Sequence, residues 1–182
     1  RFLVQQVLST LGSIDILVNN AGINRPKLPE TYEISEWDEI MDTNLRGAFL
    51  CSREVYPAMK AGGSGKIINI GSMLSLFGLA QAAVYGASKG GIVQLTRSLA
   101  VAWAKDHIQV NAILPGYINT ELTLRLKKNV PTLNERVLSR TPAARWGEAD
   151  DLAGAAIFLA SPASDFLTGV ALPVDGGFSI MV

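Results

Sequence analysis

Hydrophobic residues recur along the chain at two alternating spacings, one typical of helices and one typical of buried strands. Short apolar runs rich in β-branched residues are predicted to be strands; they cover 14–18, 66–70, 108–114 and 170–174. Helical spacing between these runs predicts helices at 1–11, 36–60, 82–105 and 149–160. Ser35, with Asp38 three residues on, is the predicted N-cap of the second helix. Strands that alternate with helices indicate βαβ crossovers, so we predict an α/β fold with a parallel sheet in one domain, 1–182.

Glycine, asparagine or serine follows each predicted strand. The motifs at the four strand ends are Asn19-Asn20-Ala21-Gly22, Gly71-Ser72, Pro115-Gly116 and Asp175-Gly176-Gly177. In a parallel sheet, ligands bind beyond the carboxyl ends of the strands. We therefore expect the four motifs to converge on one edge, with the polar insertion 119–146 covering the substrate there.

Composition and charge exclude several functional classes. Apolar residues make up 48% of the chain and charged residues 18%, which is typical of a globular protein. The 16 basic and 16 acidic residues give no net charge, so we expect no nucleic-acid partner. No apolar run reaches the roughly 18 residues of a membrane span, and we expect no membrane partner. The single cysteine, Cys51, favours a reducing compartment and a cytoplasmic location. The lone His107 offers no ligand cluster, so no metal site is expected.

Tyr85 and Lys89 form the most suggestive local pair. At spacing i, i+4 on a helix, their side chains lie on the same face. An ammonium group close to a phenol favours the phenolate and lowers the tyrosine pKa, so such a tyrosine can act as a general acid or base. By itself the pair is weak evidence, because a surface tyrosine beside a solvated lysine is the more common explanation of this spacing.

Ser72 and Asn44 add candidate chemistry with open alternatives. Ser72 follows the second strand, and its hydroxyl could hydrogen-bond the same substrate oxygen as Tyr85. It could instead cap a turn, and Ser75 competes for the catalytic role. Asn44 lies in the apolar seam of its helix, where a buried amide needs partners. It either makes a structural hydrogen bond to the backbone or holds a water at the active centre.

Taken together, these residues resemble the short-chain dehydrogenase/reductase family. The matching elements, in the family's order, are Asn19-Asn20-Ala21-Gly22, Asn44, Ser72, Tyr85-x-x-x-Lys89, Pro115-Gly116 with Thr120, and Asp175-Gly176-Gly177. The resemblance implies a doubly wound, Rossmann-like parallel sheet. It also implies reversible hydride transfer between a nicotinamide cofactor, NAD or NADP, and a small-molecule secondary alcohol (a polyol) or ketone.

The resemblance further implies a role for each site residue. Tyr85 would be the catalytic acid/base, and Ser72 would orient and polarise the substrate oxygen. Lys89 would bind the nicotinamide ribose and lower the pKa of Tyr85, while Asn44 would position a water in a proton relay to Lys89. The implied cofactor contacts are Asn20, Ala21, Gly22, Tyr85, Lys89, Pro115, Gly116, Ile118 and Thr120. A homo-oligomer, commonly a tetramer in this family, is also expected.

The glycine-rich phosphate-binding turn with which the family begins is not found after any early strand. The resemblance therefore implies that the first βα units, roughly 70–80 residues, are missing from this chain. Without them the strand 14–18 would present an exposed apolar edge. We accordingly expect this polypeptide, expressed alone, to fold poorly or to bind its cofactor weakly.

Several stretches look closest to the sugar-acid branch of the family, the gluconate 5-dehydrogenases and 2-deoxygluconate 3-dehydrogenases. They include 66–76 and 141–147. A substrate such as gluconate carries a carboxylate, and Arg25 is the candidate to hold it, although a solvated loop charge explains this arginine at least equally well. Arg145 is interpreted as structural, beside Trp146. Two alternatives stay open: a 3-oxoacyl-carrier-protein reductase, and a non-catalytic truncated subunit or interaction module.

Overall fold

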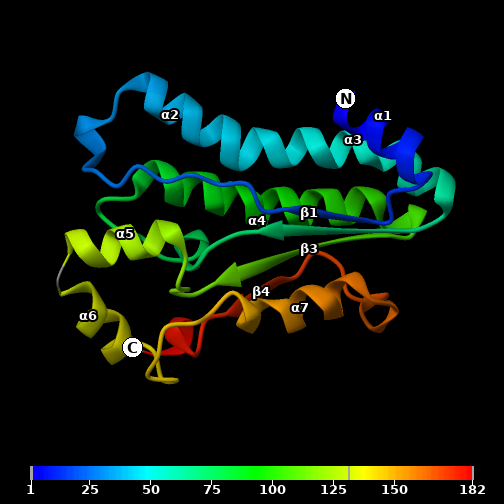
Figure 1. The fold of residues 1–182 in the computed structure, drawn as a ribbon. Coiled ribbons are helices and arrows are strands. Elements are labelled where there is room, and N and C mark those ends of the chain that lie inside the picture. The colour runs from blue at the N-terminus through cyan, green and yellow to red at the C-terminus, as the bar shows by residue number, and fades with distance from the viewer. Residues whose placement is uncertain (1, 131, 182) are drawn as a thin grey trace.

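Among the residues that the structure describes, four parallel strands form a single sheet in the order β1-β2-β3-β4 (Figure 1). The computed structural model describes residues 2–130 and 132–181. The strands are β1 (Ile16–Asn19), β2 (Gly65–Ile70), β3 (Ile108–Pro115) and β4 (Ala171–Val174). Their bounds lie within two residues of the predicted ones, and the predicted parallel α/β class is confirmed. The register pairs Asn19 with Asn69, Ile70 with Ile113 and Pro115 with Val174, so all four carboxyl ends meet at one edge.

Helices cover both faces of this sheet, as a doubly wound fold requires. Successive residues of β2 point to opposite sides. Ile67 packs among residues of α3 (Gly47–Gly62) and α4 (Ala83–Trp103), whereas Ile68 packs against Leu159 of α7 (Asp150–Ala160). Figure 1 shows α3 and α4 on one side of the strands and α7 on the other. The remaining helices are α1 (Phe2–Leu11), α2 (Ile34–Met41), α5 (Glu121–Asn129) and α6 (Leu133–Arg140).

The helix predicted over 36–60 is divided by a wider turn. α2 leads into a π-helical turn at Asp42–Arg46, and α3 continues from it to Gly62. The N-cap is Glu33, which forms a capping box with Glu36. The prediction of Ser35 as the N-cap is therefore wrong: the helix begins two residues earlier, because carboxylate groups satisfy its first backbone N–H groups.

The insertion 119–146 is helical rather than an open loop. It contains α5 and α6, and Figure 1 shows both beyond the carboxyl ends of the strands. Thr120 caps α5 by accepting a hydrogen bond from the backbone N–H of Thr123. The two helices therefore stand at the edge where the strand-end motifs converge.

β1, the outermost strand on one side of the sheet, carries exposed apolar side chains. β1 pairs with β2 alone among the described strands, and Ile16 and Val18 are each 48% exposed.

None of the helices in residues 2–130 and 132–181 combines the length and apolar character needed to cross a membrane.

Buried polar side chains join the sheet to its helices near β1 and β2. Asn19 Nδ2 donates hydrogen bonds to Asn69 Oδ1 at 2.8 Å and to Ser52 Oγ of α3 at 3.1 Å. Asn69 Nδ2 in turn donates to Thr96 Oγ1 of α4 at 2.9 Å. Asn69 is completely buried, so each of its partners depends on it for a contact that water cannot replace.

Replacing Asn69 should therefore destabilise the protein. Asn69→Ala leaves the Asn19 amide and the Thr96 hydroxyl without this partner, and we expect the free energy of unfolding to fall by about 1–3 kcal/mol. Denaturant titration measures it. Gln5→Ala, on the exposed surface of α1, is the control and should change the same quantity by less than about 0.5 kcal/mol. An Asn69 variant no less stable than the control would contradict this account of the network.

Candidate active site

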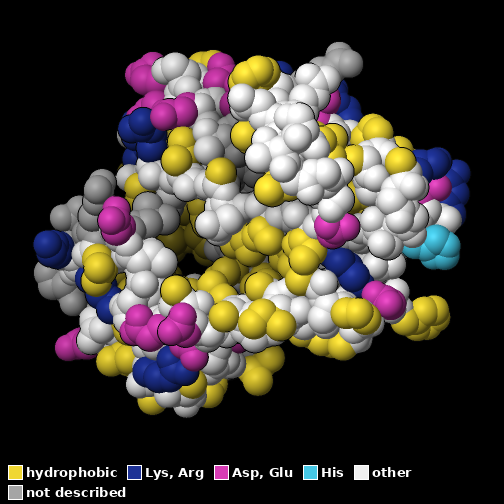
Figure 2. Space-filling model, turned by 45° about the vertical axis from the view of Figure 1, so that its right-hand side comes forward, with side chains coloured by type: hydrophobic (Ala, Val, Ile, Leu, Met, Phe, Trp, Pro, Cys, Tyr) yellow, Lys and Arg dark blue, Asp and Glu magenta, His cyan; other side chains and the backbone are white. Residues whose placement is uncertain are grey.

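The structure brings Ser72, Tyr85, Lys89 and Asn44 together at the carboxyl edge of the sheet. Ser72 follows β2, while Tyr85 and Lys89 occupy the first two turns of α4. Asn44 comes from the π-helical turn at Asp42–Arg46. On the face shown in Figure 2, charged side chains lie toward the rim, and a hollow with hydrophobic side chains on its walls opens near the middle.

Lys89 is a buried cation held at the end of β2. Its side chain is 4% exposed, and Nζ donates a hydrogen bond to the Ile70 carbonyl oxygen at 2.7 Å. Burial lowers the pKa of this ammonium to about 8, because removal of water penalises the charged form. No other residue of the described chain accepts a hydrogen bond from Nζ, so two of its three N–H donors remain available to a ligand.

The pKa of the Tyr85 phenol is raised, whereas the sequence predicted that it is lowered. Partial burial raises its pKa above the usual value, and a hydrogen bond from the Ser72 side chain opposes this increase. Lys89 Nζ lies 5.7 Å from the centre of the Tyr85 ring, with its hydrogen bond directed at Ile70. The prediction that Lys89 lowers the pKa of Tyr85 is therefore wrong for the chain by itself, because desolvation of the phenolate dominates.

The two serines have separate tasks. Ser75 Oγ donates to the Lys89 carbonyl oxygen at 2.8 Å and accepts from the Ser72 backbone N–H at 3.2 Å, so it ties the loop to α4. Ser72 Oγ accepts from the Leu74 N–H at 3.1 Å, which is the capping alternative. The Ser72 side chain also lies near enough to the phenol to oppose the rise in the Tyr85 pKa, so capping and proximity to the phenol occur together.

Asn44 makes the structural hydrogen bonds that its burial demands. Its Oδ1 accepts from the Ile23 N–H at 2.8 Å. Its Nδ2 donates to the Ile23 carbonyl at 3.0 Å and to Ser88 Oγ at 3.0 Å. This amide therefore fastens the segment after β1 to α4. π-Helical turns often occur at functional sites, because the wider turn displaces a side chain from the regular helical face.

The other predicted cofactor contacts lie on the same edge. Asn20, Ala21 and Gly22 are exposed after β1. A Cβ atom added to Gly22 would lie 3.3 Å from Lys89 Nζ and 3.5 Å from Asn44 Oδ1, so the absence of a side chain keeps the space above both groups open.

Beyond β3, packing explains several of the predicted positions. Pro115 ends β3, and a Cβ on Gly116 would lie 2.7 Å from Asp175 Cα, so glycine allows the two strand-end motifs to touch. Ile118 is buried and pairs with Gly147 in an isolated bridge, and Thr120 caps α5. A cofactor contact at these four positions stays a prediction.

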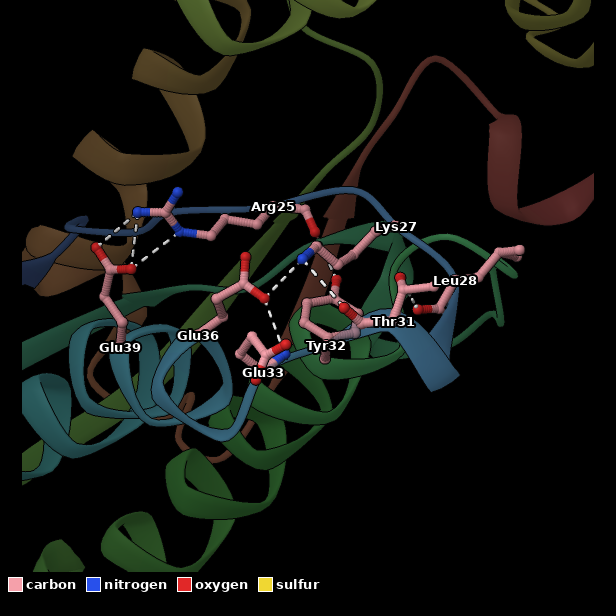
Figure 3. A network of polar contacts seen from close by, with 8 residues as sticks. All are labelled: Arg25, Lys27, Leu28, Thr31, Tyr32, Glu33, Glu36 and Glu39. Carbon is pink, nitrogen blue, oxygen red and sulfur yellow. Dashed lines mark hydrogen bonds and ion pairs between the residues drawn. The ribbon is translucent and has the colours of Figure 1, made fainter.

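Arg25 already has a carboxylate partner from this chain. Its guanidinium makes a two-point contact with Glu39, with Nε to Oε2 at 2.9 Å and Nη2 to Oε1 at 3.1 Å (Figure 3). Beside it, Lys27 pairs with Glu36 at 2.6 Å. This arrangement gives no support to Arg25 as the group that holds a substrate carboxylate. Its charge is neutralised within the loop and α2.

Arg145 is structural, as predicted. It donates to both Asp151 carboxylate oxygens, at 2.6 and 2.8 Å, and to the Trp146 carbonyl at 3.1 Å. Two arginines that the sequence interpretation passed over, Arg136 and Arg140 of α6, line a cavity with Leu74 and Tyr117. Their i, i+4 spacing on a helix was the signal that could have identified them.

Comparison with known proteins identifies the family to which this chain belongs. A family model described as enoyl-(acyl carrier protein) reductase matches residues 1–179. The chain belongs to the short-chain dehydrogenase/reductase family. No cluster of residues suited to a metal ion occurs in the described ranges.

Similar relatives act on sugar acids according to their names. The chain is 44% identical over 174 residues to 2-dehydro-3-deoxy-D-gluconate 5-dehydrogenase of Formosa agariphila, covering 96% of this chain and 66% of that protein. It is 41% identical over 170 residues to gluconate 5-dehydrogenase of Gluconobacter oxydans, covering 93% and 66%. The chain thus spans about two thirds of the length of these curated relatives.

A solved structure confirms the fold. The gluconate 5-dehydrogenase from Burkholderia cenocepacia, in complex with NADP and tartrate, superposes with a TM-score of 0.95 at 44% identity. The match covers 98% of this chain and 70% of that one.

Proposed function

We propose that this protein is a nicotinamide-dependent oxidoreductase that interconverts a secondary alcohol and a ketone on a sugar acid such as gluconate. One observation carries the proposal: the Ser72 side chain and the buried Lys89 ammonium, 5.7 Å from the centre of the Tyr85 ring, both lie near the phenol at the edge where strand-end motifs converge. The names of the relatives favour a sugar acid as the substrate class.

NAD or NADP is the proposed cofactor, and the residues of the site fit it. The two free donors of Lys89 suit ribose hydroxyl groups, and Gly22 leaves room above them. Asn20, Ala21, Pro115, Gly116, Ile118 and Thr120 are the proposed further contacts. When bound, the nicotinamide donates or accepts the hydride. The neighbour from Burkholderia cenocepacia was solved with NADP, which supports this choice.

In the proposed mechanism, three side chains of this site have different roles in proton transfer. In ketone reduction, Tyr85 donates its phenolic proton to the substrate oxygen, and Ser72 donates a hydrogen bond to the same oxygen. The raised pKa of Tyr85 keeps the phenol protonated at neutral pH, as an acid requires. Lys89 is mostly charged at that pH and provides the counter-charge for the phenolate that remains.

A proton route past Asn44 completes the proposed mechanism. Asn44 Oδ1 and Lys89 Nζ both border the space above Gly22. Lys89 would return a proton to the Tyr85 phenolate, and a water held there by Asn44 would then give a proton back to Lys89. In alcohol oxidation the same steps run in reverse, so Tyr85 removes the proton from the substrate hydroxyl.

Self-association is a further part of the proposal. A groove between the π-helical turn and α4 is lined by apolar side chains, including Met41, Leu45, Phe49 and Leu95. Phe49 remains 39% exposed at its margin. Contiguous exposed apolar surface of this kind typically marks a protein contact, and we propose a homo-oligomer, with a tetramer as the preferred state.

Replacing the phenol tests the acid/base role. Tyr85→Phe should lower kcat for gluconate oxidation by about 10²–10⁴-fold, because proton transfer loses its donor and acceptor. The Kd of NADP should change by less than about twofold, measured by fluorescence titration, since the Lys89 contact stays. Tyr56→Phe, which removes a hydroxyl that hydrogen-bonds Asp106, is the matched control and should keep near-normal turnover. Near-normal turnover by Tyr85→Phe would refute the role.

The same assays separate the alternatives. A 3-oxoacyl-thioester reductase would reduce acetoacetyl thioesters and ignore gluconate. A non-catalytic subunit or interaction module would turn over neither compound.

The titration of Lys89 predicts a pH dependence of cofactor affinity. Its pKa in the folded protein is about 8, so the ammonium is present below that pH and is lost as the pH rises through it. We expect the Kd of NADP to increase across this range in the wild type. Lys89→Met should bind weakly on both sides, with no change centred near pH 8. A wild-type Kd that stays constant across pH 8 would contradict the Lys89 contact.

The apolar groove predicts how self-association can be weakened. A charge introduced by Phe49→Glu would be buried in the proposed interface, and its desolvation should shift the protein toward the monomer. Light scattering after gel filtration measures the mass. Phe166→Glu, at a fully exposed position after α7, is the matched control and should leave the mass unchanged. A wild-type protein that is monomeric at assay concentrations would contradict this part of the proposal.

A further inference from the structure

A small cavity lies beside the loop that follows Ser72. Its volume is about 40 Å³, and its apolar wall includes Leu74, Phe77, Tyr117 and Phe178. Such a volume holds about two or three waters and therefore the polar end group of a ligand rather than a whole sugar acid.

Two guanidinium groups form the charged part of this cavity. Arg136 and Arg140 lie four residues apart on α6, so their side chains leave the helix on the same face. The Arg140 guanidinium stacks over the Phe178 ring at 4.6 Å, which orients it within the cavity. The charges of both groups therefore act on the same small space.

Neither charge is neutralised by a carboxylate of the described residues. Within residues 2–130 and 132–181, neither guanidinium has an ion-pair or hydrogen-bond partner, and no carboxylate lines the cavity. Arg25 and Arg145 provide the contrast, because each is paired with a carboxylate at two points. Two adjacent cations repel each other, so a bound anion would relieve the repulsion and accept a two-point hydrogen bond.

The cavity lies next to the loop that carries Ser72, one of the proposed catalytic residues. Leu74, which lines the cavity, donates its backbone N–H to Ser72 Oγ at 3.1 Å. Tyr117 lines it from the other side, directly after the Pro115-Gly116 motif. The cavity therefore adjoins the loop that carries Ser72, and a sugar acid whose reacting carbon lies at Ser72 and Tyr85 would reach it by extending its opposite end toward α6.

We propose that Arg136 and Arg140 bind the carboxylate of the sugar-acid substrate and thereby select acids over neutral polyols. This inference rests on the function proposed above. It assigns carboxylate binding to the two arginines that have no carboxylate partner in the described chain, instead of to Arg25.

The test compares an acid with a neutral polyol of the same chain length. Arg136→Gln and Arg140→Gln should each raise KM for gluconate by about tenfold to a hundredfold, with kcat little changed, because the carboxylate contact is the same in the ground and transition states. kcat/KM for a hexitol should stay within about twofold, as should the Kd of NADP. Arg140→Lys should give an intermediate KM, because it keeps the charge and loses the planar fork.

Lys128→Gln is the matched control. It removes one positive charge from the exposed surface of α5 in the same insertion, and KM for gluconate should stay within about twofold. If this control raises KM as much as the arginine variants do, general electrostatic attraction explains the effect and the proposed subsite is overturned.

Other outcomes separate this inference from the function on which it rests. A wild type that oxidises gluconate and the hexitol with equal kcat/KM, or arginine variants that leave KM for gluconate unchanged, would overturn the arginine subsite and leave the proposed function standing. A wild type that turns over no sugar acid would overturn both. Unfolding temperatures measured for each variant show whether a lost contact or a damaged fold explains a change in KM.

Discussion

The buried Lys89 ammonium joins the sheet to the residues around the candidate site. It is removed from water and donates its hydrogen bond to the Ile70 carbonyl, at the carboxyl end of β2. This contact holds the start of α4 over the strand end, which places Tyr85, one helical turn earlier, beside Ser72. The burial that positions the cation also lowers its pKa to about 8, so its structural and chemical roles have one physical origin.

Buried amides support the surrounding segments in a similar way. Asn44 binds both backbone groups of Ile23 and the Ser88 hydroxyl. On the far side of the sheet, Asn111 donates to the Leu167 carbonyl and accepts from the Val170 N–H. A buried amide without partners is costly, so each satisfied one holds its loop in one arrangement. Asn44 thus holds a loop at the edge where the site lies, and Asn111 holds the segment that leads into β4.

The arginines show how packing gives identical side chains different tasks. Glu39 neutralises the charge of Arg25, and Asp151 neutralises the charge of Arg145. The contact with Arg145 lowers the pKa of Asp151. Arg136 and Arg140 meet aromatic and aliphatic side chains instead. The chain contains equal numbers of positive and negative residues, yet their distribution leaves two arginines, unpaired within the described chain, next to each other in the insertion 119–146.

The sequence by itself determined the layers of this fold and the place of its site. Apolar periodicity revealed the strands and helices, and the parallel crossovers required the motifs after Asn19, Ile70, Pro115 and Val174 to share one edge. Spacing likewise placed Tyr85 and Lys89 on one helical face. These conclusions succeed because periodicity is a local property and crossover geometry admits few solutions.

Only the tertiary structure decided the π-helical turn that carries Asn44, the partner of Arg25 and the direction of the Tyr85 pKa. The partner of Arg25 and the pKa of Tyr85 depend on which distant segments supply an opposite charge or exclude water. Burial and partner choice are properties of the packed chain, and no local spacing contains them.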